Sequence, residues 1–128
     1  MYDFVLSTND QSAIPNDPTI GKQLIYVPKQ NASCNFAVSY KTLSINFNYI
    51  YTGYRYETSD NTQFLNPYQL GNAVISKKFN VKHLHFRLFA KVNNIWNEPY
   101  QVIAWYAMPL RNYQAGIAIE FNQPTKLN

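Results

Sequence analysis

The sequence predicts an all-β protein, an antiparallel up-and-down meander of about six strands of the length that crosses a bilayer. The first observation is composition: aromatic residues make up 16% of the chain, charged residues only 14%, and glycines number four. Such a composition is typical of strands whose outer face meets lipid or a partner. The second is the alternation of apolar and polar residues. The third is a regular change between long and short connections.

The strands follow one another along the chain, with the clearest alternation in residues 84–92 and 113–121. In the first of these, one face carries Leu84, Phe86, Leu88, Ala90 and Val92, and the other carries His85, Arg87, Phe89 and Lys91. The expected strands are residues 2–7, 31–41, 43–56, 70–79, 84–95 and 112–121.

The connections indicate a membrane barrel. Residues 8–30, 57–69 and 96–110 form long loops, whereas short turns lie around 41–42 and at 80–83. Long loops at one end and tight turns at the other are typical of an antiparallel outer-membrane barrel, whose short turns are periplasmic. The pattern therefore predicts three extracellular loops, a last strand that ends at the periplasmic side, and a location in the bacterial cell outer membrane.

Other classes of function find little support. The basic residues that give a net charge of +4 are scattered, so no nucleic-acid partner is expected. Cys34 is the only cysteine, and the two histidines, His83 and His85, lack a third ligand at a convincing spacing. We therefore expect no metal and no cofactor. No nucleophile is framed by a base and an orienting acid, so the protein is not expected to be an enzyme.

The segment "KVNNIWNEPYQVIAWYAMPLRNYQAGIAIEF", with "LIYVPKQNA", "YTGYRYETSDN" and "LGNAVISKKF" before it, resembles the C-terminal end of a TonB-dependent outer-membrane receptor of the type common in Bacteroidetes-like bacteria. The resemblance covers residues 2–121. The residues that match its two motifs are Val92, Asn94, Ile95, Trp96, Asn97 and Tyr100, then Tyr106, Met108, Pro109, Arg111 and Tyr113. Ala107 and Leu110 depart from the usual Pro and Gly.

The last strand also resembles the signal read by the barrel-assembly machinery. The matching residues are Gln114, Gly116, Ile119 and Phe121. In the family the aromatic residue is usually the last, whereas here the tail "NQPTKLN", residues 122–128, follows it.

The resemblance implies that residues 1–121 are the last strands of a 22-stranded barrel that an N-terminal plug fills. The complete receptor would take up a scarce nutrient (siderophore-iron, cobalamin or a glycan). Its partners would be outer-membrane lipid, the assembly machinery, the remaining strands and plug, and TonB through parts that this chain lacks. Six strands alone leave two open edges, so the fragment is not expected to act alone.

Ligand contacts are expected in the long loops, because loops on rigid strands carry specificity. The candidate residues are Tyr54, Tyr56, Phe64, Trp96, Tyr100, Trp105 and Tyr106. The competing interpretation, favoured for most of the aromatic residues at the strand ends, is an interfacial aromatic girdle. Two alternatives stay open for the whole chain: a small soluble β-sandwich that binds carbohydrate, and a porin-like barrel assembled from several copies.

Overall fold

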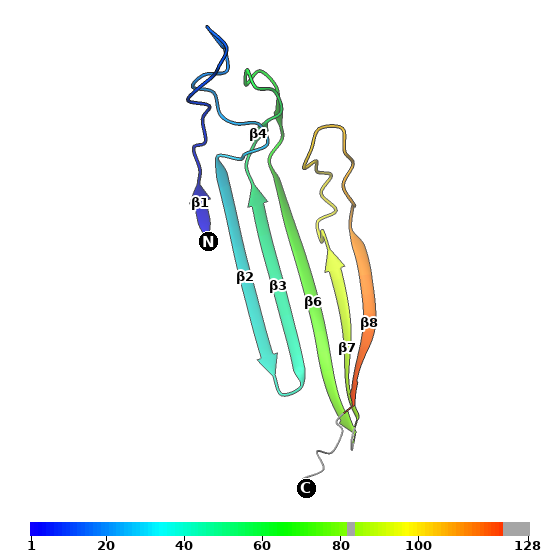
Figure 1. The fold of residues 1–128 in the computed structure, drawn as a ribbon. Helices are drawn as coiled ribbons and strands as arrows, with labels where there is room; N and C mark the ends of the chain where they lie inside the picture. Colours follow the sequence, from blue (N-terminus) through cyan, green and yellow to red (C-terminus); the bar gives the residue numbers. More distant parts are fainter. Residues whose placement is uncertain (82–83, 122–128) are drawn as a thin grey trace.

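A computed structural model of the chain describes residues 1–81 and 84–121, and this part is built from β-strands and loops. Six strands form one antiparallel sheet in the order β1-β2-β3-β6-β7-β8, and β4 and β5 form a small second sheet (Figure 1). The strands are β1 Tyr2–Phe4, β2 Gln30–Tyr40, β3 Leu43–Thr52, β4 Arg55–Tyr56, β5 Phe64–Leu65, β6 Tyr68–Val81, β7 Leu84–Asn93 and β8 Asn112–Phe121. The predicted six-stranded meander is thus confirmed.

The register of the sheet sorts side chains onto two faces. Residues directly opposite each other in neighbouring strands share a face of the sheet. One row joins Val38, Ile45, Ile75, Ala90 and Ala115. We call this side of the sheet the apolar face. The opposite side, the polar face, carries Asn35, Ser39, Ser44, Asn48, Asn72, Ser76, Lys78, Arg87, Lys91, Gln114 and Glu120.

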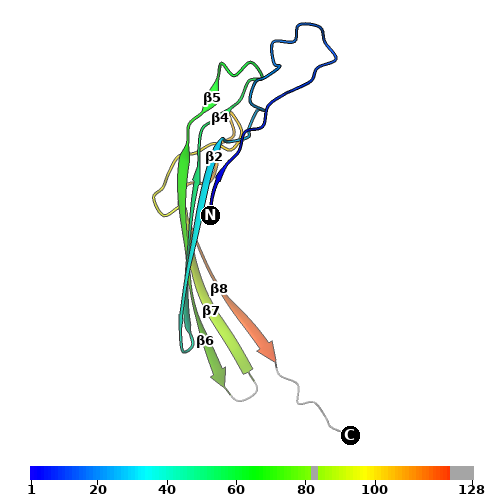
Figure 2. The ribbon, with the colours of Figure 1, turned by 90° about the vertical axis from the view of Figure 1, so that its left-hand side faces the viewer.

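The six-stranded sheet is a single curved layer (Figure 2). Within the described ranges the only buried hydrophobic residue is Leu65, which lies in the small hairpin. Large side chains of the apolar face stay open, with Phe36 60% and Ile117 66% exposed. An apolar surface of this extent marks contact with lipid or another protein. No helix long and apolar enough to cross a membrane occurs in the part of the chain that the structure describes.

Several predicted boundaries were wrong, each for a local reason. The first strand ends at Phe4, because beyond Val5 the chain pairs with the first long loop instead, through Leu24 N to Ser7 O. The third strand ends at Thr52, because the chain leaves the sheet at Gly53. After Gly53, β4 (Arg55–Tyr56) forms a small antiparallel hairpin with β5 (Phe64–Leu65). This hairpin lies partly inside residues 57–69, which were expected to form a long loop.

The remaining strands differ mainly in length. β6 has 14 residues, more than predicted, because it pairs with β3 from Tyr68 onward. β7 stops at Asn93, since Asn94 takes a left-handed φ of 52° that ends the strand. The predicted tight turn at Lys41–Thr42 is confirmed, with Lys41 at φ 53°. His83, part of the turn expected at 80–83, and the tail 122–128 lie outside the described residues.

Candidate functional site

The long loops gather at one end of the sheet, opposite the β2–β3 turn (Figure 1). Between the β4–β5 hairpin and the loop after β7 lies an open groove of about 620 Å³. Its aromatic walls are Phe64 and Tyr68 from one side and Tyr100 and Trp105 from the other, with Glu57 and Gln101 among the polar lining residues. A ligand in this groove would meet flat rings and a few hydrogen-bonding groups, which suits a molecule with both apolar and polar surface.

Arg55 fixes the two sides of the groove to each other. Its side chain is only 3% exposed, and it donates hydrogen bonds to the carbonyl oxygens of Gln101 at 2.7 Å and of Val102 at 3.5 Å. Its guanidinium carbon lies 5.0 Å from the centre of the Tyr68 ring. No carboxylate within the described ranges pairs with this cation. Carbonyl oxygens and a ring face therefore take the place of a counter-ion.

Asparagine side chains shape the loop that follows β7. Asn94 is 3% exposed, donates through Nδ2 to the Glu98 carbonyl and accepts from the Glu98 amide. The amide of Arg111 donates to Asn97 Oδ1, which joins the two ends of the loop. Both asparagines have a positive φ, a conformation that this residue type tolerates because its short side chain bonds to nearby backbone. The loop is held at both ends by these hydrogen bonds, and its middle places Tyr100 and Trp105 along the groove.

A second tie connects the first long loop to the β4–β5 hairpin. Asn61, at the hairpin turn, accepts from the amide of Gln23 through Oδ1 and donates to the Gln23 carbonyl through Nδ2, both at 2.9 Å. This pair of bonds mimics one step of a β-ladder between segments that are 38 residues apart. The carboxylate of Asp60 beside it accepts from Thr62, and hydrogen bonding by Thr58 and then by Thr62 lowers the pKa of Asp60.

The structure brings together five of the seven predicted ligand-contact residues. Phe64, Tyr100 and Trp105 line the groove. Tyr54 packs edge-on against both Tyr56 and Phe64, with ring centres 5.6 Å and 6.2 Å apart. The ammonium of Lys29 lies within 6 Å of both tyrosine rings, at 5.9 Å and 5.8 Å. Partial burial, and then the neighbouring Tyr68, raise the pKa of Tyr100.

The other two predicted residues lie elsewhere. Tyr106 is 69% exposed and does not line the groove. Trp96 lies edge-on to Phe47 and Tyr49 of the apolar face, with ring centres 6.4 Å and 5.8 Å away. Its ring covers Gly71 so closely that a Cβ there would stand 2.6 Å from Trp96 Cη2. This position favours the girdle interpretation for Trp96.

The polar face also carries a row of asparagines that the sequence pattern did not single out. Asn35, Asn48 and Asn72 are cross-strand partners, and Asn48 donates to Asn35 at 2.7 Å while Asn72 donates to Asn48 at 3.4 Å. Asn93 donates to its partner Asn112 at 2.8 Å. Val92 is the partner of Ala73 in the antiparallel register, so the next residue, Asn93, lies at the level of Asn72. The Asn93–Asn112 pair therefore lies at the same level of the sheet as the row from Asn35 to Asn72. The alternation along each strand predicts that each of these asparagines lies on the polar face. Only the register between strands shows that they lie side by side.

The residues of the predicted assembly signal occupy β8. Gly116 lies directly opposite Phe89, whose ring fills the space over the glycine. Gln114 lies opposite Lys91 on the polar face, Ile119 opposite Phe86 on the apolar face, and the backbone of Phe121 pairs with Leu84. Among the described residues no group of three or more potential metal ligands occurs, and His85 Nδ1 lies 2.8 Å from Asn80 Oδ1.

Comparison with known proteins gives one family. The sequence model of a family described as TonB dependent receptor-like, beta-barrel matches residues 2–95, which is more than half of the chain. The match includes β1 to β7, the small hairpin and the beginning of the loop after β7. No curated protein matches the chain.

Proposed function

The chain belongs to the TonB-dependent receptor-like β-barrel family, and from this membership we propose that it forms part of the wall of an outer-membrane receptor that captures a scarce nutrient. The long loops would bind the nutrient outside the cell, and energy relayed through TonB would drive its uptake. The activity would belong to the complete receptor, a 22-stranded barrel with a plug, because the six-stranded sheet of the described residues does not close into a barrel.

The two faces of the sheet support this role. A barrel wall in a membrane needs apolar side chains toward lipid and polar side chains toward the lumen, in strict alternation along every strand. From β2 to β8 the sheet largely has this arrangement; Lys77 on the apolar face and Val74 and Phe89 on the polar face are exceptions. Among the described residues the outer edge of β8 has no partner strand, and a sheet edge in lipid must be paired. Neighbouring barrel strands, inserted by the assembly machinery, would provide that pairing.

The observation that carries the ligand proposal is the groove between Phe64 and Trp105. It lies at the loop end of the sheet, and Trp105 is 91% exposed, so most of its ring is open to contact with a ligand. Aromatic faces beside polar groups suit stacking on a sugar, a catecholate or a corrin ring. The candidate nutrients therefore remain a glycan, a siderophore-iron complex and cobalamin.

Fluorescence can test this groove, because the chain contains two tryptophans and only Trp105 lies in it. The chain would be refolded in detergent micelles and titrated with one representative of each nutrient class. We expect a saturable change of emission in the variant Trp96→Phe, which reports Trp105, and none in Trp105→Phe. Equal responses of both variants, or none to any nutrient, would reject the groove as the ligand site.

The soluble β-sandwich alternative does not fit the fold. A sandwich needs two sheets packed face to face around a dry core. In the described part of the chain the six-stranded sheet has neither face covered, and the second sheet consists of two strands of two residues each.

A further inference from the structure

Two cations face each other across neighbouring strands near the turn end of the sheet. Lys78 of β6 and Arg87 of β7 are direct cross-strand partners on the polar face. Partners of this kind have Cβ atoms about 4.5–5.5 Å apart, and like charges in such a pair are destabilising. Positions that break a local rule in this way are often functional.

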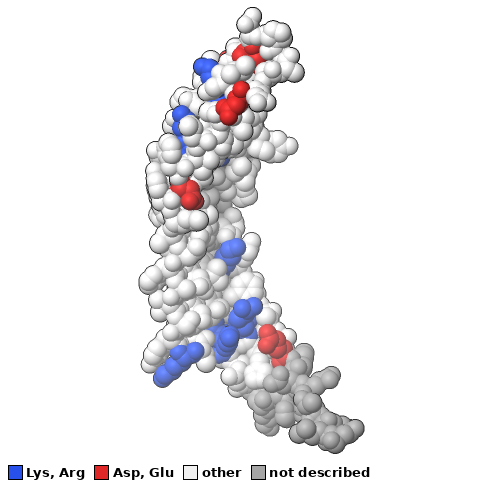
Figure 3. Space-filling view, turned by 60° about the vertical axis from the view of Figure 1, so that its left-hand side comes forward, with Lys and Arg blue, Asp and Glu red and all other residues white. Residues whose placement is uncertain are grey.

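The protein itself supplies little compensation. Strands β2 to β8 carry a single carboxylate, that of Glu120. Within the described ranges it forms no ion pair with Lys78 or Arg87. Figure 3 shows Lys and Arg gathered over the lower part of the molecule, where few acidic groups lie. The local charge is therefore positive even with Glu120 present.

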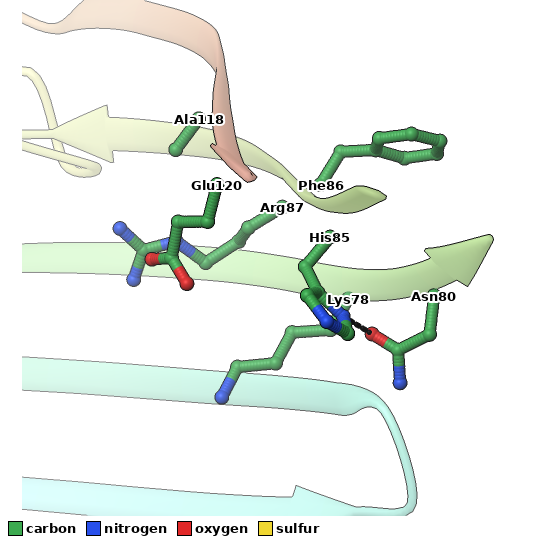
Figure 4. A pocket seen from close by; sticks show the side chains of 7 residues that line it. All are labelled: Lys78, Asn80, His85, Phe86, Arg87, Ala118 and Glu120. Atoms are coloured by element: carbon green, nitrogen blue, oxygen red, sulfur yellow. Dashed lines mark hydrogen bonds between the residues drawn. The ribbon is translucent and has the colours of Figure 1, made fainter. Parts of the chain in front are cut away.

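A cavity of about 380 Å³ lies among these groups. Its lining residues are Lys78, Asn80, His85, Phe86, Arg87, Ala118 and Glu120, and Figure 4 shows their side chains. The imidazole of His85 is oriented by Asn80, whose Oδ1 lies 2.8 Å from Nδ1. His85 in turn lies opposite Glu120 in the register. The cavity thus offers an ammonium and a guanidinium to an anion, and only one group that repels it.

We propose that this cavity binds a small multivalent oxyanion, of the phosphate or pyrophosphate class, that bridges Lys78 and Arg87. A doubly charged oxyanion would accept charge-assisted hydrogen bonds from both side chains and replace their repulsion by two attractions. The site is distinct from the groove in the long loops, which lies at the other end of the sheet.

The test measures pyrophosphate binding to the full chain in uncharged detergent micelles, by calorimetry, with ionic strength held constant by NaCl. Lys78→Gln and Arg87→Gln should each weaken binding at least about tenfold, since each loses a hydrogen bond to a charged group. The matched control is Lys91→Gln, on the same face, because the partners of Lys91 are the uncharged Val74 and Gln114. This control should bind as the wild type does. Glu120→Gln should bind more tightly.

A second measurement follows thermal loss of the β-sheet signal without the anion. Lys78→Gln relieves the repulsion and should melt at a higher temperature than the wild type, whereas Lys91→Gln should not. Pyrophosphate should then raise the melting temperature of the wild type more than that of Lys78→Gln. The proposal is overturned if the wild type binds no pyrophosphate, if Lys91→Gln weakens binding as much as Lys78→Gln, or if Lys78→Gln melts no higher than the wild type.

Discussion

The ring of Phe89 covers Gly116 of the neighbouring strand, so closely that a Cβ on residue 116 would stand 2.6 Å from Phe89 Cζ. The two residues are direct partners in the register of β7 and β8. An aromatic ring that lies over a glycine in a partner strand shields the backbone that the glycine leaves bare. The glycine therefore has a packing reason to be in this strand, beside its proposed part in the assembly signal.

We predict that Gly116→Ala destabilises the sheet by about 1 kcal/mol, because the new methyl group displaces the Phe89 ring. Urea unfolding in micelles measures the change in free energy. In a Phe89→Ala background the ring is gone, and the same substitution should cost almost nothing. An equal cost in both backgrounds would show that the ring is not responsible. Loss of membrane assembly in both backgrounds would instead assign the glycine to the assembly signal.

The two tryptophans should differ in their effect on stability. Trp96→Ala should cost about 1–2 kcal/mol, because the ring packs on Gly71 and against Phe47 and Tyr49 and leaves a gap when it is removed. Trp105→Ala, which removes a side chain that is 91% exposed, should change the free energy of unfolding by less than about 0.5 kcal/mol. The same unfolding measurement serves both, and a larger loss at Trp105 would contradict the described packing.

Arg55→Met should loosen the loop that follows β7. The substitution leaves the carbonyl oxygens of Gln101 and Val102 without their donor, and we expect a loss of about 1–3 kcal/mol. Limited proteolysis should show faster cleavage within residues 94–111. Lys22→Met is the control, since Lys22 is an exposed cation of another loop. Similar cleavage of the two variants would mean that Arg55 does not hold the loop.

Asn48→Ala should break the row of asparagines at its centre. Asn48 both donates to Asn35 and accepts from Asn72, so its loss removes two side-chain hydrogen bonds and should cost about 1 kcal/mol. Asn46→Ala is the matched control on the same strand and face, because Asn46 makes no side-chain hydrogen bond within the described part of the chain. Equal unfolding free energies of the two variants would show that the row contributes nothing.

The carboxyl group of Asp60 should titrate below its usual value of 3.8, as measured by carbon-detected NMR. Its lowered pKa means that hydrogen bonds from Thr58 and Thr62 favour the ionised form. The stabilising effect of these bonds is present above the ordinary pKa and is lost as pH falls through the lowered one. Thr58→Val should raise the pKa of Asp60 toward 3.8. An unchanged pKa in this variant would refute the assigned cause.

Much of the fold was predictable because it depends on local patterns. Alternation predicted which residues share a face, and the turn at Lys41–Thr42 was evident where two alternating segments meet. The ends of β1 and β3 were not predictable from the sequence. Hydrogen bonds to the first long loop decide where β1 ends, and the β4–β5 hairpin decides where β3 leaves the sheet. The aromatic residues of the groove were predictable as loop residues. The position of Trp96 on the apolar face was not.

By itself the sequence determined the meander, its two faces and the end of the sheet where the long loops lie, since alternation and loop length are read along the chain. Only the tertiary structure decided which side chains meet across strands and loops. The register puts Lys78 opposite Arg87, and the loop contacts put Arg55 beside Gln101, 46 residues away. A shift of one residue in a strand would send every side chain to the other face. Such pairings depend on long-range register, which no single segment specifies.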